Sequence, residues 1–196
     1  NDFNGRWRAG FNLQNLGPKL SCDNTQSSTN FLPSNMKLGG GFDFILDDYN
    51  KVALNLEVSK LLVPTPQDPD LNGDGVVTPE ERNQNNDNYD NIGWFQGIGQ
   101  SFSDAPGGFS EELKEVTYSM GAEYLYQDSF ALRMGYFNEN KDKGARQFFS
   151  LGAGFRYTAI KVDVSYLFST SKVKNPLENT LRFSLTFNFG DQYDEY

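Results

Sequence analysis

Residues 179–190 read NTLRFSLTFNFG, and this stretch decides the fold. Leu181, Phe183, Leu185, Phe187 and Phe189 alternate with polar residues. Successive side chains of a β-strand point to opposite faces, so the stretch predicts a strand with one apolar and one polar face. A strand of a soluble β-sandwich could show the same alternation. The Phe-rich, uncharged face, the length and the aromatic end near the C-terminus favour a closing strand of a membrane barrel.

The same alternation recurs along the rest of the chain. Seven further strands are predicted over residues 5–16, 36–46, 51–62, 115–127, 130–138, 147–157 and 160–168. About eight strands of roughly ten residues, each apolar on one face, are typical of a membrane barrel. The sequence therefore predicts an all-β fold, a transmembrane antiparallel outer-membrane β-barrel, with residues 1–196 forming a single domain.

The connections between these strands alternate between long and short. The three shortest lie at Asp47, Gln127 and Thr158, on the side of the sheet where the last strand ends. Outer-membrane barrels have short periplasmic turns and longer outer loops. The pattern therefore predicts a protein of the cell outer membrane with extracellular long loops and a periplasmic C-terminus. This alternation of long and short connections is not expected of a soluble sandwich.

The composition agrees with a chain surrounded by outer-membrane lipid. The hydrophobic content is 37% and the mean hydropathy is −0.60, as expected for a polar lumen and wet loops. No apolar run approaches the ~18 residues of a transmembrane helix. The net charge of −9 argues against nucleic acid as a partner. The first ten residues lack the pattern of a signal peptide, so either one has been removed or the chain begins partway through a longer protein.

The residue types give little support for enzymatic chemistry, and no catalytic residue is predicted. The chain has no histidine, which excludes Ser-His and Cys-His dyads and histidine-bearing zinc sites. A pair of carboxylates could in principle act as acid and base. Salt bridges on the polar faces are the commoner explanation for the charged strand residues, namely Arg8, Asp43, Glu57, Glu123, Arg133, Arg156, Lys161, Asp163 and Arg182.

The longest connection, residues 63–114, is predicted to be an extracellular loop, and it contains a calcium-binding motif. Residues 70–81 read DLNGDGVVTPEE, which matches the EF-hand loop pattern D-x-[DN]-x-[DN]-G-x5-E. Gly75 allows the sharp turn at position six, and oxygen ligands converge on the cation. The predicted ligands are Asp70, Asn72, Asp74, the Val76 carbonyl, Thr78 and Glu81. The alternative is a solvated acidic loop without an ion.

Two prolines limit what this motif predicts. Pro64 and Pro66 are incompatible with a regular helix before the loop, so a paired, opening EF-hand sensor is not expected. A bound calcium ion would instead stiffen an outer loop whose ordering otherwise costs considerable entropy.

Residues 91–109 of the same connection are apolar and Gly-rich. The large side chains are Trp94, Phe95, Ile98, Phe102 and Phe109. Exposed apolar patches often mark interaction sites, so these residues are predicted to bind a partner protein. The alternative is that they pack over the mouth of the barrel.

Two C-terminal stretches resemble a known family. MGAEYLYQDSFALRMGYFNENKDKGARQFFSLGAGF (residues 120–155) and NPLENTLRFSLTFNFGDQYDEY (residues 175–196) are similar to PorV, also called LptO. This is the outer-membrane barrel component of the type IX secretion system, and its fold is related to the FadL fatty-acid channels. The resemblance covers the chain but only the C-terminal part of the family, whose barrels have on the order of fourteen strands. It implies that the chain holds about eight strands of a larger, FadL-like barrel, as a fragment, a processed product or half of a split barrel.

The resemblance also implies a function. PorV-like proteins are expected to be non-enzymatic partners of the translocon barrel SprA (or Sov). They receive the C-terminal signal domain of cargo and pass cargo to the surface attachment complex that contains the PorU sortase. Two alternatives stay open. A FadL-like channel for hydrophobic molecules needs an apolar lumen, whereas most polar-face positions here are polar or Gly. A lipopolysaccharide deacylase is disfavoured by the absence of histidine.

Overall fold

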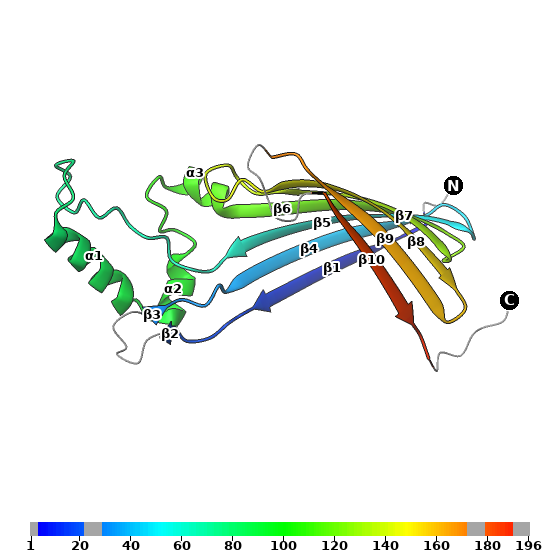
Figure 1. Ribbon diagram of the computed structural model, residues 1–196, viewed down its shortest axis with the longest axis horizontal. Helices are drawn as coiled ribbons and strands as arrows, with labels where there is room; N and C mark the ends of the chain where they lie inside the picture. Colours follow the sequence, from blue (N-terminus) through cyan, green and yellow to red (C-terminus); the bar gives the residue numbers. More distant parts are fainter. Residues whose placement is uncertain (1–3, 22–28, 172–178, 190–196) are drawn as a thin grey trace. The chain divides into compact units, whose positions relative to one another are not determined.

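The computed structural model describes residues 4–21, 29–171 and 179–189, and its main feature is an eight-stranded sheet (Figure 1). The sheet order is β1-β4-β5-β6-β7-β8-β9-β10, so each strand lies beside its neighbour in the chain order. The pairs from β6 to β10 are antiparallel. The strands are β1 (Gly5–Gln14), β4 (Asn35–Ile45), β5 (Asn50–Leu61), β6 (Val116–Tyr126), β7 (Phe130–Asn138), β8 (Gln147–Tyr157), β9 (Ile160–Ser169) and β10 (Thr180–Phe187).

The all-β prediction is confirmed, and the eight predicted strands correspond to these eight strands. The boundaries of 130–138 and 147–157 agree to the residue, and the others shift by one to three residues. Of the stretch 179–190, Gly190 lies outside the described residues. Among the described residues the sheet is open, with β1 and β10 as its two edges.

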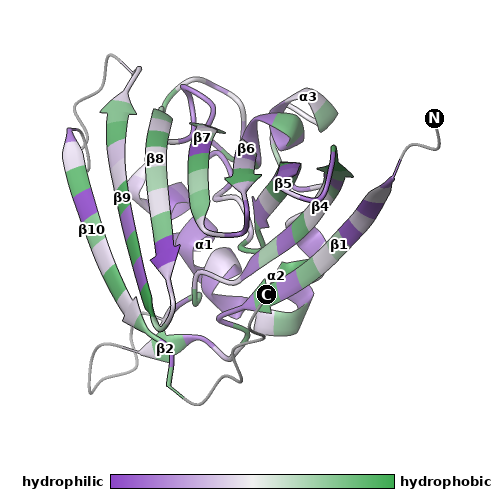
Figure 2. Cartoon of the chain, turned by 90° about the vertical axis from the view of Figure 1, so that its right-hand side faces the viewer, coloured by the Kyte–Doolittle hydropathy of each residue, from purple (hydrophilic) through white to green (hydrophobic). Residues whose placement is uncertain are grey.

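The apolar face of the sheet is exposed along its strands. Phe183 on β10 is 67% exposed and Trp7 on β1 is 81% exposed. Figure 2 shows the green apolar bands alternating with polar bands along the strands. The few buried apolar side chains of the described residues are mostly alanines. A soluble sandwich would bury this face against a second sheet, whereas an exposed Phe-rich face suits contact with lipid.

The opposite face carries ion pairs that the register brings together. Glu123 on β6 lies opposite Arg133 on β7, and Arg133 binds both this carboxylate and Asp163 Oδ1 on β9, the latter at 2.6 Å. The intervening strand β8 contributes Gly154. A Cβ atom at Gly154 would lie 2.5 Å from Asp163 Oδ1, so glycine leaves the space that this ion pair occupies.

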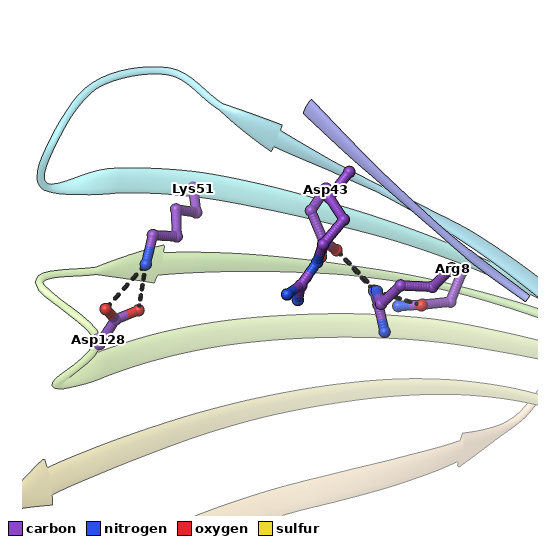
Figure 3. A network of polar contacts seen from close by, with 6 residues as sticks. Arg8, Asp43, Lys51 and Asp128 are labelled. Carbon is purple, nitrogen blue, oxygen red and sulfur yellow. Dashed lines mark hydrogen bonds and ion pairs between the residues drawn. The ribbon is translucent and has the colours of Figure 1, made fainter. Parts of the chain in front are cut away.

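A second set of polar contacts involves β1, β4, β5 and the turn between β6 and β7 (Figure 3). Arg8 Nη2 on β1 donates to Asp43 Oδ1 at 2.7 Å and to Asn55 Oδ1 at 2.9 Å. Lys51 Nζ on β5 contacts Asp128 Oδ2 at 2.8 Å in the turn between β6 and β7. The charged strand residues that form the predicted salt bridges include Arg8, Asp43, Glu123, Arg133, Lys161 and Asp163.

The chain divides into two compact units. The first, the sheet unit, comprises Asn1–Gly10, Leu38–Val58 and Thr117–Tyr196. The second, the insert unit, comprises Phe11–Lys37 and Ser59–Val116. Across residues 4–21, 29–171 and 179–189, no helix is long and apolar enough to cross a membrane.

The insert unit contains regular structure where the sequence predicted loops. Residues 63–114, predicted as one long loop, include α1 (Pro79–Asn91), α2 (Trp94–Gln100), α3 (Phe109–Glu112) and the 3-10 helix η1 (Leu113–Glu115), which ends one residue beyond it. The segment before β4 contains a short hairpin, β2 (Leu20–Ser21) with β3 (Thr29–Asn30). The prediction of a plain loop over residues 63–114 was wrong, because short polar helices leave little hydrophobic periodicity to read.

Candidate functional site in the connection between β5 and β6

Helix α1 begins at the end of the predicted calcium loop. Thr78 is its N-cap, and Thr78 Oγ1 accepts from the Glu81 amide at 3.3 Å. Glu81 Oε2 in turn accepts from the Thr78 amide at 3.0 Å, which completes a capping box. Pro79 at the first helical position fits because its missing N–H has no intrahelical partner there. No regular helix precedes the loop between residues 62 and 78, as the prolines predicted.

The predicted ligands lie in a tightly turned segment. Asp70 Oδ1 and Oδ2 accept from the amides of Gly73 and Gly75, both at 2.8 Å. Asn72 Oδ1 and Asp74 Oδ1 each accept from the amide two residues on, Asp74 Oδ1 from Val76 at 2.8 Å. Gly75 has φ of 83°, the left-handed conformation that glycine adopts without strain, as the turn at position six requires.

The carboxylates of the loop are not gathered around one point. Glu81 Oε2 is engaged by the Thr78 amide and hydroxyl. Within the part of the chain that the structure describes, no three Asp, Glu, His or Cys side chains form a group that could hold a metal ion. The donor types suit a hard cation, whereas binding through all six positions would require Glu81 to turn from its cap towards the loop.

A buried ion network closes the base of the connection. Lys60 Nζ, at the end of β5, lies 2.8 Å from Glu112 Oε2 on α3 and 2.8 Å from Glu115 Oε2 on η1. Thr65 Oγ1 donates to Glu115 Oε1, and the Ala105 amide donates to Glu112 Oε1, both at 2.9 Å. These contacts join residues at the two ends of the connection. The first and last residues of the connection are therefore held together by this network.

The predicted partner-binding side chains lie on α2, on the segment after it and, for Phe109, at the start of α3. Phe95 is 75% exposed and Phe109 is 78% exposed, whereas Ile98 is only partly exposed. Trp94 and Phe95 contact each other with ring centroids 5.7 Å apart, and the Phe102 ring centroid lies 6.0 Å from Lys60 Nζ. Trp94 and Phe102 are also exposed. The four exposed aromatic residues, Trp94, Phe95, Phe102 and Phe109, are named the aromatic surface below.

Asp104 and Tyr89 are the two ionisable side chains of a cavity beside α1. The cavity has a volume of about 710 Å³. Burial raises the pKa of the Asp104 carboxyl, and the negative charges of Glu112 and Glu115 add to this effect. Burial likewise raises the pKa of Tyr89, with Asp104 and Asp90 contributing. Asp104 Oδ2 accepts from the Thr65 amide at 2.9 Å, whereas Oδ1 is buried and has no partner among the described residues.

Sequence reasoning missed α1, the Lys60 network and this cavity. One local signal was available for the helix, because Thr78-Pro79-Glu80-Glu81 combines a capping box with proline at the first helical position. No local signal was available for the network, since Lys60 is 52 residues from Glu112 and 55 from Glu115.

Comparison with known proteins gives one family match. The family model described as type IX secretion system protein PorV matches residues 1–68. No curated protein matches the chain. The matched stretch lies outside the segments 120–155 and 175–196 on which the resemblance to PorV was based, so it confirms that resemblance from a different part of the chain. A match at the N-terminal end gives no support to the expectation that the chain corresponds only to the C-terminal part of the family.

Proposed function

We propose that this chain, recognised as PorV-like by the match of residues 1–68, is a non-enzymatic outer-membrane component of the type IX secretion system. In this proposal it binds the SprA/Sov translocon barrel, receives the C-terminal signal domains of cargo and carries them to the PorU-containing attachment complex. The family match is the single observation that carries the proposal. The antiparallel sheet with an exposed Phe-rich face supports a place in the outer membrane.

The aromatic surface is the part of the chain that we assign to protein partners. Aromatic residues dominate the energetics of many protein interfaces, because they bury a large area with few rotatable bonds. Phe95 and Phe109 have the largest exposed fractions of the set. The Lys60 network beneath this segment would keep the surface preorganised, which lowers the entropic cost of binding.

A pull-down from solubilised outer membrane tests the proposal. The tagged wild-type protein is expected to recover the translocon barrel and cargo carrying C-terminal signal domains. The double variant Phe95→Ser/Phe109→Ser is expected to lose most of both. Leu113→Ser, which also replaces an exposed apolar side chain of the connection, is the matched control and should recover them normally.

Two results would contradict different parts of the proposal. Recovery of neither translocon nor cargo by the wild type would refute the carrier role itself. Equal recovery by the wild type and the double variant would refute only the assignment of the aromatic surface.

We also propose that residues 70–81 bind calcium and thereby stabilise α1. Asp70, Asn72, Asp74, Thr78 and Glu81 would supply side-chain oxygens, and Val76 its carbonyl. The ion would also neutralise part of the negative charge of this acidic loop. Because it would bind the folded loop and not the unfolded one, a free calcium concentration of 100 times Kd would add about 2.7 kcal/mol to the stability of the segment.

Hydrogen exchange of the α1 amides, with and without calcium, tests this second proposal. Glu81→Gln removes the charged ligand but retains a residue compatible with the capping box. Glu80→Gln makes the same charge change at a position of the motif that is not a predicted ligand. Calcium should slow exchange in the wild type and Glu80→Gln but not in Glu81→Gln, and an equal response of the two variants would exclude the site.

A further inference from the structure

The cavity beside α1 lies wholly within the insert unit and serves no purpose in the functions proposed above. Its walls come from α1, the end of α2, residues 103–106 and the segment after β5. Its volume of about 710 Å³ falls in the range of small-molecule sites. The inference below concerns this cavity alone and does not depend on a role in secretion.

Three polar side chains that line the cavity have unused hydrogen-bonding capacity. Asn88 on α1, Gln100 at the end of α2 and Ser103 make no side-chain hydrogen bond to another described residue. The side-chain amides of Asn88 and Gln100 can each donate and accept hydrogen bonds, and so can the Ser103 hydroxyl. Such groups complement a ligand whose own groups both donate and accept.

The remaining walls are partly apolar. Tyr89 follows Asn88 on α1, Ile92 is the residue directly after this helix, and both line the cavity. Tyr89 is held in place because its hydroxyl donates to the Pro64 carbonyl at 3.2 Å and its ring contacts Phe31. The cavity therefore combines neutral polar groups with an aromatic and aliphatic wall.

The charge of the lining disfavours ionic ligands. No lysine or arginine lines the cavity among the described residues, so a phosphate or carboxylate would find no cation and would be repelled by Asp104. A cationic ligand would also lack an accessible counter-charge, because Asp104 Oδ1 is buried and Oδ2 accepts a hydrogen bond from the Thr65 amide. The groups that a ligand can reach are neutral.

We propose that this cavity binds a neutral sugar unit. The sugar hydroxyls would exchange hydrogen bonds with Asn88, Gln100 and Ser103. The C–H face of the ring would pack against Tyr89 and Ile92. The site is thus a carbohydrate-binding site in the connection between β5 and β6.

Saturation-transfer NMR on the detergent-solubilised chain of residues 1–196 tests the proposal. The probes are D-glucose, D-galactose, D-mannose and their methyl glycosides, each at about 10 mM, a concentration that nearly saturates a site with Kd of 1 mM. Glucose 6-phosphate serves as the anionic probe and Nα-acetyl-lysine methylamide as the cationic probe. At least one neutral sugar should give a signal stronger than that of either charged probe.

Matched variants connect the signal with the cavity. Losing one neutral hydrogen bond weakens binding by roughly fivefold to tenfold, so Asn88→Ala/Gln100→Ala should weaken it at least tenfold. Neither side chain makes a hydrogen bond that the fold would lose, and alanine favours the helix at position 88. Asn86→Ala, on α1 but outside the cavity, should bind like the wild type. The proposal is overturned if no neutral sugar binds, if a charged probe binds best, or if the double variant retains the signal.

Discussion

At the scale of single residues, Lys60 is the charged group whose burial has the largest expected effect on the stability of the insert unit. Its side chain is 9% exposed and faces two carboxylates whose side chains are 8% and 12% exposed. Removing one member of a buried ion network leaves the other charges without compensation, which costs much more than losing an exposed pair. The free energy that holds the insert unit together therefore depends strongly on this residue.

Lys60→Met should destabilise the insert unit by about 3–5 kcal/mol, because Glu112 and Glu115 would stay buried and unpaired. Urea unfolding followed by Trp94 fluorescence measures this, in a Trp7→Phe background that leaves Trp94 as the remaining tryptophan. Lys51→Met breaks the exposed pair with Asp128 and should cost at most about 1 kcal/mol. Equal effects of the two substitutions would contradict the role given to burial.

Asp104 makes the stability of the insert unit depend on pH. Burial raises the pKa of this carboxyl in the folded protein above its pKa in the unfolded chain. The stability that the protonated carboxyl contributes is therefore fully present at pH values below the unfolded pKa, and it is lost as the pH rises through the folded pKa. Asp104→Asn keeps an acceptor for the Thr65 amide and removes the charge. The variant should therefore gain stability relative to the wild type at neutral pH but not at acid pH, as measured by the same urea titration at several pH values.

Glu139 provides a comparison of opposite sign. The Arg146 hydrogen bond, with Nε 2.7 Å from Glu139 Oε2, lowers the pKa of this carboxyl. The stability that the charged Glu139 carboxylate contributes is present at pH values above its unfolded pKa, and it is lost as the pH falls through its lower, folded pKa. Glu139→Gln should therefore destabilise the chain at neutral pH and have little effect at low pH. If both variants changed the stability at neutral pH in the same direction, burial would not be the cause of the raised pKa of Asp104.

At the scale of elements, α1 is a polar helix that depends on its ends. The structure buries none of its residues, so tertiary packing contributes little to its stability. A helix of this length is marginal in isolation, because nucleation is costly and each end leaves backbone groups unpaired. The capping box of Thr78 and Glu81 acts at the N-terminus of α1, where it satisfies backbone groups that have no partner within the helix.

Thr78→Ala should destabilise α1 by about 1 kcal/mol, because the Glu81 amide loses its side-chain acceptor. Faster hydrogen exchange of the amides in Pro79–Asn91, measured without calcium, is the expected result. Thr78→Ser retains a hydroxyl that caps equally well and should leave exchange nearly unchanged. If both variants exchange like the wild type, the helix is held by contacts other than its cap.

At the scale of the whole molecule, the two faces of the sheet have opposite requirements. The apolar face exposes Phe183 and Leu181, whereas residues of the other face pair with each other, as Arg133 does with Asp163. An exposed apolar area this extensive is unfavourable in water and favourable in lipid. A charge introduced on one face should therefore act differently from the same charge on the other.

Phe183→Lys should hinder folding into lipid vesicles by about 2–4 kcal/mol if the residue lies near the membrane midplane. Ser184→Lys, the neighbouring position on the polar face of β10, should fold nearly as well as the wild type. The fraction of heat-modifiable protein on gel electrophoresis after refolding measures both. A larger defect in Ser184→Lys than in Phe183→Lys would reverse the assignment of the faces.

The sequence by itself determined the strands, their faces and the resemblance to PorV. β7 and β8 were predicted to the residue, because alternation between two faces is a local property that their nine and eleven residues express completely. Tertiary structure decided the interior of the connection between β5 and β6. The helix α1 buries no residue and so has no apolar face to predict it, and the Lys60 network and the cavity join residues far apart in sequence, whose proximity only the folded chain creates.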